Sequence, residues 1–191
     1  AINLGVSRAE AEELIAAGYD GVAVSPVDGD KQASALRRLG RDVHLVTLDA
    51  DSPLSNRICF VGCNNYTAGR ECGRLIREAL PEGGEVAVII GSLEKANGRL
   101  RRQGVIDELL DRPFNPDRAR DPVDEPLEGD MFTVVRTYVD DISPEEAKSN
   151  AVAALEDHPD LDGFAGLYGY STPAILAALE EKGRLGDLAV V

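Results

Sequence analysis

Short runs of apolar residues recur along the chain, with little alternation between apolar and polar positions. The runs cover residues 21–24, 43–48, 58–62, 85–90, 132–139, 164–167 and 188–191. A strand that is apolar at successive positions is covered on both faces, as strands are in parallel sheets. The pattern therefore predicts a set of buried parallel strands.

Helical spacing of apolar residues fills the stretches between these runs. The expected helices cover residues 8–17, 30–39, 67–80, 98–111, 144–157 and 173–182. Their expected ends are glycines and prolines, at Gly18, Gly40, Pro81, Pro113 and Gly183. Ser143, Pro144 and Glu146 form a capping box before the fifth helix, and Thr172 with Pro173 predicts the start of the sixth. Strand–helix alternation at this spacing indicates an α/β fold with doubly wound parallel sheets.

Residues 112–130 interrupt this alternation. Four prolines and many charged residues lie there, and no apolar period continues through them. The segment is expected to be an inserted, mobile surface loop between a helix and a strand.

Composition limits the classes of function. The 191 residues carry a formal net charge of −14, so no nucleic-acid partner is expected. No apolar run approaches the length needed to span a membrane. Cys59, Cys63 and Cys72 are odd in number and lack the spacing of a disulfide framework, which predicts three buried free thiols.

Catalytic motifs are missing from the sequence. It contains no G-x-S-x-G elbow, no Walker A loop and no G-x-G-x-x-G after a strand. The two histidines, His44 and His158, have no partner at a spacing typical of metal ligands. Asp140 and Asp141 are either an acid–base pair or a turn at a strand end with solvated charges. No catalytic residue, metal site or cofactor is therefore predicted.

Two tyrosines mark the first candidate binding site. Tyr168 and Tyr170 lie between an apolar strand and a helix, and Ser171 belongs to the same turn. Open α/β sheets bind ligands at this carboxyl edge, where an aromatic ring with a hydroxyl group can stack on a polar ligand and hydrogen-bond to it. The alternative is that one tyrosine packs against the helix and the other is solvated.

Polar residues follow other strands in the same way. Asp49 comes directly after the strand at 43–48, and its carboxylate suits vicinal hydroxyl groups, although it is equally typical of a turn or an N-cap. Asn64 follows the next strand and is either a ligand contact or a turn residue.

An arginine cluster opens the fourth helix. Arg99 opposes the helix dipole there, which either a polar ligand or an ion pair with Glu94 would explain. Arg102 shares a helix face with Arg99, whereas Arg101 is expected to point elsewhere.

Five blocks of the sequence, in order, resemble the ribose-type (type 1) periplasmic solute-binding proteins of bacterial ABC sugar importers. The blocks are GYDGVAVSPVDGD, VHLVTLDAD, VGCNNYTAGRECGRLI, NGRLRRQGVIDEL and HPDLDGFAGLYGYSTPAILAAL. The resemblance covers almost the whole chain except the loop at 112–130.

The resemblance implies two doubly wound lobes, joined by a three-stranded hinge, that close around one ligand. Residues 1–63 would be a partial N-terminal lobe, without the family's first strand, first helix and second strand. Residues 64–191 would be most of the C-terminal lobe.

The family pattern also implies roles for the candidate residues. Asp49 would accept hydrogen bonds from sugar hydroxyls, Arg99 would donate to the ligand, and Asn64 would lie beside the site at the hinge. The family's usual Asn-Asp pair after the strand at 164–167 is absent, so Tyr168, Tyr170 and Ser171 would form a different wall.

The function implied is that of a non-enzymatic receptor for a monosaccharide or similar polyol. It would be a monomer, either periplasmic or lipid-anchored outside the cytoplasm, and it would deliver its ligand to an ABC permease. The alternative is the effector-binding domain of a sugar-responsive transcriptional repressor. An upstream signal peptide or an upstream helix-turn-helix would distinguish the two. An α/β enzyme, the third class, is disfavoured by the missing catalytic motifs.

Overall fold

The computed structural model describes residues 8–191, which divide into two compact units. The first unit comprises the chain up to Asn64 together with Glu94–Asn97, and the second comprises Asn65–Leu93 and Gly98–Val191. The boundary expected after residue 63 differs by one residue from the first change of unit. The short segment Glu94–Asn97 was not expected to belong to the first unit.

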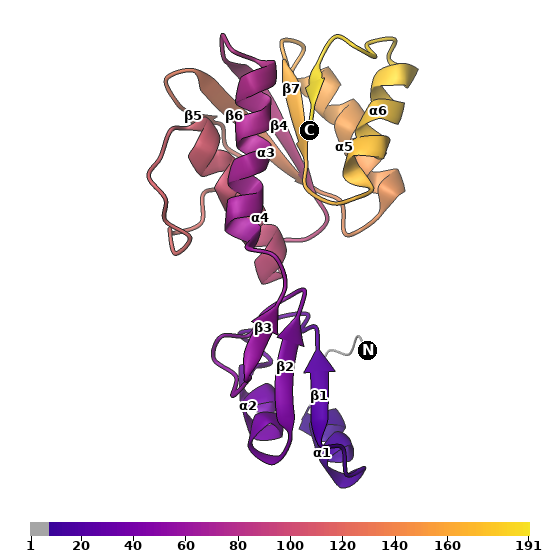
Figure 1. Ribbon diagram of the computed structural model, residues 1–191. Coiled ribbons are helices and arrows are strands. Elements are labelled where there is room, and N and C mark those ends of the chain that lie inside the picture. Colours follow the sequence, from indigo (N-terminus) through magenta and orange to yellow (C-terminus); the bar gives the residue numbers. More distant parts are fainter. Residues whose placement is uncertain (1–7) are drawn as a thin grey trace. The chain divides into compact units, whose positions relative to one another are not determined.

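The first unit is a small parallel sheet with two helices. Its three strands follow the order β1-β2-β3. The elements are α1 (Arg8–Ala16), β1 (Gly21–Val24), α2 (Ala33–Asp42), β2 (His44–Leu48) and β3 (Cys59–Val61) (Figure 1). Leu36, Leu39 and Leu45 are fully buried and form its core with Val24 and Val43. The predicted parallel pairing of these strands is confirmed, but the predicted burial is not, since most residues of β1 and β3 are exposed.

Gly40 does not end α2, contrary to the expectation, because the helix continues to Asp42. A Cβ atom on Gly40 would lie 2.8 Å from the carbonyl oxygen of Asn56. The glycine is therefore needed for the close approach of the loop after β2. Gly18, with a φ of 73°, does follow the end of α1, as expected of a left-handed glycine.

The second unit is a doubly wound sheet in the order β5-β6-β4-β7-β8. Its elements are α3 (Asn65–Ala79), β4 (Gly84–Ile90), α4 (Ala96–Leu109), β5 (Leu127–Glu128), β6 (Phe132–Val139), α5 (Pro144–Asp157), β7 (Gly163–Gly166), α6 (Ser171–Glu181) and β8 (Ala189–Val190). The strands β4, β6, β7 and β8 pair in parallel, and the short β5 pairs antiparallel with β6.

The central strand β4 is buried on both faces. Val86 and Val88 pack in one apolar cluster with residues of α3 and α4, and Ala87 and Ile89 pack in another with residues of α5 and α6. Figure 1 shows these two pairs of helices on opposite sides of the sheet. The predicted doubly wound arrangement is confirmed.

The starts of three helices test the local predictions. Ser143 caps α5 as expected, and its hydroxyl accepts from the Glu146 N–H at 3.1 Å. The predicted cap at Thr172 is wrong, because α6 begins at Ser171 and its N-cap is Tyr170 in a helical conformation. Helix α3 begins at Asn65, earlier than expected.

Two further expectations disagree with the structure. The segment 112–130 contains strand β5 and is fixed to α4 by hydrogen bonds described below, so it is not the free loop expected. Cys59 and Cys63 are exposed, because they lie on and just after the exposed strand β3. Only Cys72 is substantially buried, which raises the pKa of its thiol to about 11.

Helices α3 and α4 touch backbone to backbone. A Cβ atom on Gly69 of α3 would lie 2.0 Å from the carbonyl oxygen of Arg101, and one on Gly104 of α4 would lie 2.2 Å from that of Tyr66. Atoms at such distances overlap, so only glycine fits at either position. This contact fixes how the first two turns of α3 lie against the middle of α4.

Gly104→Ala should destabilise the second unit by about 1–3 kcal/mol, the usual cost of forcing extra atoms into a packed contact. The higher helix propensity of alanine, about 1 kcal/mol, would partly offset this cost. Gly169→Ala is the control, because a Cβ there meets nothing within 4 Å. Urea denaturation of both variants measures the difference, and equal midpoints would contradict the close-contact argument.

Candidate functional site

The turn after β7 holds two tyrosines at the carboxyl edge of the larger sheet. The rings of Tyr168 and Tyr170 lie 5.8 Å apart between centroids and are tilted by 49°. Both are half-buried, with Tyr168 against the α3–α4 cluster and Tyr170 against the α5–α6 cluster. The alternative in which one tyrosine is solvated is therefore wrong.

Gly91, at the end of β4, makes room for both tyrosines. A Cβ atom on it would lie 2.6 Å from the Tyr170 hydroxyl and 3.0 Å from Cε1 of Tyr168. Sequence analysis did not single out this glycine, although its place directly after a buried strand was a usable signal.

Ser171 holds the turn from the inside. It is fully buried, and its hydroxyl accepts from the Tyr168 N–H at 3.3 Å. The expectation that Ser171 is a wall residue facing a ligand is therefore corrected, because its hydroxyl group is enclosed by the start of α6.

Arg101, rather than Arg99, reaches the tyrosine turn. Its Nε donates to the side chain of Asn65 at 2.8 Å, and its Nη1 donates to the Leu167 carbonyl at 3.1 Å. Its guanidinium lies 5.9 Å from the centroid of the Tyr168 ring, within cation–π range. Arg101 thus has partners different from those of Arg99 and Arg102, and the sequence did not reveal that these partners lie at the tyrosine turn.

The other two arginines of the cluster have different surroundings. Arg99 donates to the Leu93 carbonyl at 3.3 Å, and buried Arg102 donates to the Thr137 hydroxyl at 2.7 Å. Arg101 precedes the buried Val105 by four residues, so helical periodicity already placed it on the inward face.

The two asparagines at the unit boundary differ in exposure. Asn65, the first residue of α3, is buried and accepts the hydrogen bond from Arg101. Asn64 is exposed and belongs to the first unit. The sequence could not separate the two, because adjacent amides at a strand end look alike.

Asp49 lies at the carboxyl edge of the smaller sheet. It follows β2 in the left-handed conformation, with a φ of 61°, and its N–H donates to the Val61 carbonyl at 3.0 Å. Its side chain is exposed, and it caps no helix. The position suits an acceptor for an external donor.

Asp51 is committed to the fold instead. Its carboxylate accepts hydrogen bonds from Nε and Nη2 of Arg57 at 2.5 and 2.7 Å, and from the Thr47 hydroxyl at 2.6 Å. Partial burial raises the pKa of Asp51, but the hydrogen bonds from Arg57, Thr47 and the Ser52 N–H outweigh it and hold the pKa below its usual value.

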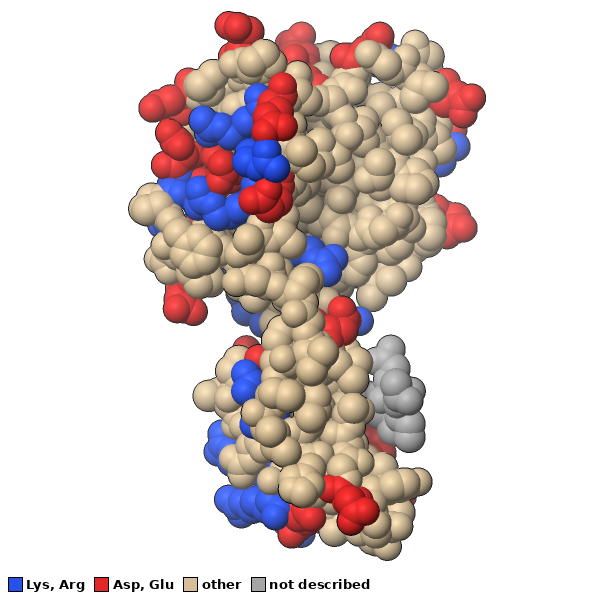
Figure 2. Space-filling view, in the orientation of Figure 1, with Lys and Arg blue, Asp and Glu red and all other residues tan. Residues whose placement is uncertain are grey.

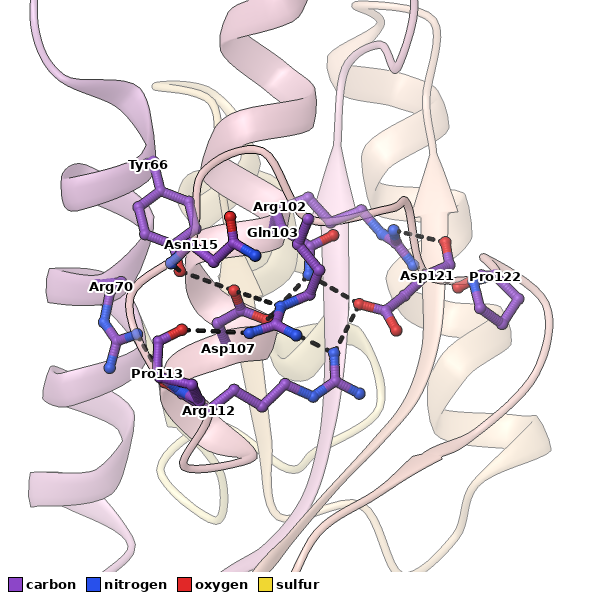
Figure 3. Close-up of polar contacts among 11 residues, drawn as sticks. Tyr66, Arg70, Arg102, Gln103, Asp107, Arg112, Pro113, Asn115, Asp121 and Pro122 are labelled. Carbon is purple, nitrogen blue, oxygen red and sulfur yellow. Dashed lines mark hydrogen bonds and ion pairs between the residues drawn. The ribbon is translucent and has the colours of Figure 1, made fainter.

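A buried polar network locks the helices that carry Asn65 and Arg101. Its centre is Asp107 of α4, which is fully buried (Figure 3). The carboxylate accepts from the Tyr66 hydroxyl at 2.7 Å, from Gln103 at 3.0 Å and from Nε of Arg118 at 3.1 Å. Tyr66 belongs to α3, so the network joins both helices to the segment after α4.

Asp121 extends the network along the same segment. Its carboxylate accepts from Gln103 at 2.7 Å and from Arg112 at 2.8 Å. Its backbone carbonyl and that of Pro122 accept from the guanidinium of Arg102. Burial raises the pKa of Asp121, yet the bonds from Gln103 and Arg112 outweigh it, so the pKa lies below its usual value.

Charges of both signs alternate over α3. Figure 2 shows basic and acidic side chains interleaved there, and they include Arg74 between Glu71 and Glu78, and Arg70 at 2.6 Å from Glu108. Exposed pairs of this kind contribute about 0–1 kcal/mol each. This surface carries no patch of a single sign.

No helix within the described residues 8–191 has the length and apolarity needed to cross a membrane. Within the same residues, no group of three or more His, Cys, Asp and Glu side chains is arranged to hold a metal ion.

Each of the two units has polar groups at the carboxyl edge of a parallel sheet, which is where open α/β sheets bind ligands. The chain belongs to the periplasmic binding protein family, since residues 6–191 match the family model described as a periplasmic binding protein domain.

The relatives found are sugar-binding proteins. The D-ribose/D-allose-binding protein of Pseudomonas aeruginosa is 25% identical over 192 residues, which cover 94% of this chain and 53% of that protein. An ABC transporter solute-binding protein from Burkholderia graminis, solved with D-arabinose, is 28% identical with a TM-score of 0.81, covering 96% of this chain and 59% of that one. A glucose-galactose binding protein from Geobacillus stearothermophilus shares the fold, at 23% identity and a TM-score of 0.79 over 96% and 60% of the two chains. The chain spans about half the length of its curated relative.

Asp107→Asn should destabilise the second unit by about 3 kcal/mol, the lower end of the range for breaking a buried ion pair. The change removes the charge that faces Arg112 and Arg118 and turns one acceptor atom into a donor. Asp117→Asn, on an exposed residue of the same segment, should stay within about 0.5 kcal/mol of wild type. Urea denaturation of both variants compares them, and equal losses would show that Asp107 is not the centre of the network.

Proposed function

We propose that this protein is an extracytoplasmic receptor that binds a monosaccharide or similar polyol and delivers it to an ABC importer. The observation that carries the proposal is the cluster of Tyr168, Arg101 and Asn65 at the carboxyl edge of the larger sheet. Membership of the periplasmic binding protein family and the sugar-binding relatives support it.

The chemistry of the cluster suits a sugar. A tyrosine ring can stack on the apolar face of a pyranose or furanose, and a guanidinium supplies several fixed donors to hydroxyl and ring oxygens. Arg101 is half-buried and oriented by its hydrogen bonds to Asn65 and to the Leu167 carbonyl, so little side-chain entropy remains to be lost when a ligand binds.

The edge of the smaller sheet would supply the acceptor. Asp49 is exposed there, and an ionised carboxylate accepts from two vicinal hydroxyls at once. Asn64, also exposed in this unit, would add an amide that both donates and accepts. The earlier assignment of Arg99 as the donor gives way to Arg101, whereas Asp49, Asn64, Tyr168 and Tyr170 stay as proposed binding residues.

The role proposed is binding without chemistry. Hydrolysis or phosphoryl transfer needs a positioned acid–base pair, an activated nucleophile or a metal-bound water. The cluster of Tyr168, Arg101 and Asn65 supplies hydrogen-bond donors and an aromatic face, which suit reversible capture. The receptor would act as a monomer in the periplasm or on a lipid anchor.

Thermal unfolding of the intact protein with a panel of pentoses, hexoses, inositols and nucleosides tests the function. A sugar that binds only the native state at a hundred times its Kd should stabilise it by about 2.7 kcal/mol. Calorimetry then gives the Kd, and NMR of the ligand checks that it is recovered unchanged. Stabilisation by nucleosides alone, or accumulation of product beyond one equivalent, would contradict the proposal.

Asp49→Ala should weaken sugar binding by about 1.5–3 kcal/mol, the usual value of hydrogen bonds to a charged group. Asp20→Ala is the matched control, since Asp20 is also exposed but precedes β1 at the amino edge of the same sheet. Calorimetry compares the two variants. Equal affinities would remove Asp49 from the site.

Arg101→Lys should weaken sugar binding by at least about tenfold, because an ammonium cannot reproduce the two bonds that orient the guanidinium. Arg99→Lys should change the affinity by no more than about twofold, since the positive charge is kept at a position whose bond to the Leu93 carbonyl is a long one of 3.3 Å. The same calorimetry decides between them, and a larger effect at Arg99 would restore the original assignment.

A further inference from the structure

Asp140 is a fully buried carboxylate at the carboxyl end of β6, beside the tyrosine turn. Its N–H donates to the Ile90 carbonyl at 3.0 Å, which fixes its backbone to the end of β4. Its Oδ1 accepts from the Tyr170 hydroxyl at 2.5 Å and from the Ile142 N–H at 3.0 Å. Its Oδ2 is buried and has no hydrogen-bond partner among the described residues.

This arrangement is costly for the fold. A buried carboxylate with one unsatisfied oxygen loses hydration that nothing replaces on that side. Burial raises the pKa of Asp140, the bonds from Tyr170 and the Ile142 and Ser143 N–H groups oppose the rise, and the charge of Asp141 adds to it. Perturbed carboxylates of this kind are concentrated at functional sites.

The turn that follows Asp140 is strained. Asp141 and Ile142 both have left-handed backbones, with φ of 50° and 64°. For a β-branched residue such as Ile142 this conformation is a genuine outlier. The Ile142 N–H, which lies 3.1 Å from the Gly91 carbonyl and 3.0 Å from Oδ1 of Asp140, helps to hold the strained residue in place.

Oδ1 of Asp140 is therefore hydrogen-bonded to two parts of the carboxyl edge of the sheet, the strained turn and Tyr170. Tyr170 in turn lies against Tyr168, with the ring centroids 5.8 Å apart. The bond to the carboxylate also raises the pKa of the Tyr170 hydroxyl, after the larger effect of burial, so this group stays a donor.

We propose that Asp140 is a positioning residue whose ionised carboxylate fixes Tyr170 and the turn at 140–143, so that sugar affinity falls when Asp140 is protonated. The inference rests on the proposed function. Protonation turns a charge-assisted bond into a neutral one of about half the strength. The strained turn and Tyr170 are then held less firmly by Asp140, and the rings of Tyr168 and Tyr170 lose their fixed geometry.

The charged and titratable groups around Asp140 are few. Asp141 lies in its own turn, Tyr170 at the start of α6, and Tyr168 in the preceding turn, with Arg101 of α4 against the Tyr168 ring. Glu145 and Glu146 lie in the first turn of α5. In proteins generally, carboxylates are the side chains whose charge changes in mild acid, whereas tyrosine and arginine change charge only at much higher pH.

Stability and binding should respond to pH in opposite directions. The pKa of folded Asp140 is raised, so its contribution to stability is complete below the unfolded pKa and is lost as pH rises through the folded value. Asp140→Asn does not titrate and should therefore unfold at a higher temperature than wild type near neutrality, with the gain disappearing in acid. If the ionised carboxylate of Asp140 instead stabilised the fold, Asp140→Asn would unfold at a lower temperature than wild type near neutrality.

The test is calorimetry with the best sugar of the panel, from about pH 7.5 down to about pH 4.5, a range that spans a raised carboxylate pKa. Wild-type affinity should fall by about fivefold or more on acidification, the difference between a charge-assisted and a neutral bond. At every pH, Asp140→Asn should bind the sugar with the affinity that wild type shows in acid, because its amide oxygen still accepts a neutral hydrogen bond from Tyr170. Tyr170→Phe should be weakened near neutrality, with a smaller dependence on pH.

Asp141→Asn is the matched control, an exposed neighbour at which asparagine tolerates the left-handed backbone. It should lose affinity on acidification as wild type does, with the fall moved to lower pH, because the charge of Asp141 no longer raises the pKa of Asp140. Identical pH profiles in wild type and Asp140→Asn would overturn the positioning role while leaving the receptor function intact. A wild type that binds no sugar at any pH would instead overturn the proposed function and this inference with it. Circular dichroism checks that each variant is folded.

Discussion

Helices α3 and α4 meet where two glycines allow their backbones to touch, and the larger unit is organised around this contact. Gly69 and Gly104 leave no room for a Cβ, so the first two turns of α3 and the middle of α4 are held at a fixed separation. At that separation Asn65 accepts a hydrogen bond from Arg101, and the Tyr66 hydroxyl donates one to Asp107. The cluster of Tyr168, Arg101 and Asn65 and the buried network around Asp107 therefore depend on the same close approach of the two helices.

The aspartates at the two carboxyl edges differ in how far the fold satisfies their hydrogen bonds. Asp51 satisfies Arg57, Thr47 and a backbone N–H, and its lowered pKa reflects those bonds. Asp49, two residues earlier, is exposed and turned outward by a left-handed backbone. In the larger unit Asp140 is buried but only half satisfied. An unsatisfied buried carboxylate costs stability, so its presence at this carboxyl edge supports the positioning role proposed for it.

Tertiary contacts give several residues a role different from the one that the sequence predicted. Gly40 looked like a helix end, yet it lies inside α2 opposite the Asn56 carbonyl. Ser171 looked like a ligand contact, yet its hydroxyl group closes the turn beneath Tyr168. Residues 112–130 looked like a free loop, because charge and proline are typical of exposed segments. Their charged groups instead complete the bonding of Asp107 and Asp121.

The sequence by itself determined the α/β class, the buried parallel strands and the strand ends at which polar residues collect, because apolar period and turn chemistry are local properties. It also carried the resemblance to the binding-protein family, which the match over residues 6–191 confirms. Only the tertiary structure decided which arginine meets the tyrosines, which aspartate is buried, and where α3 and α4 touch. These features depend on contacts such as that of Asp140 with Tyr170, thirty residues apart, and no local pattern records such a distance.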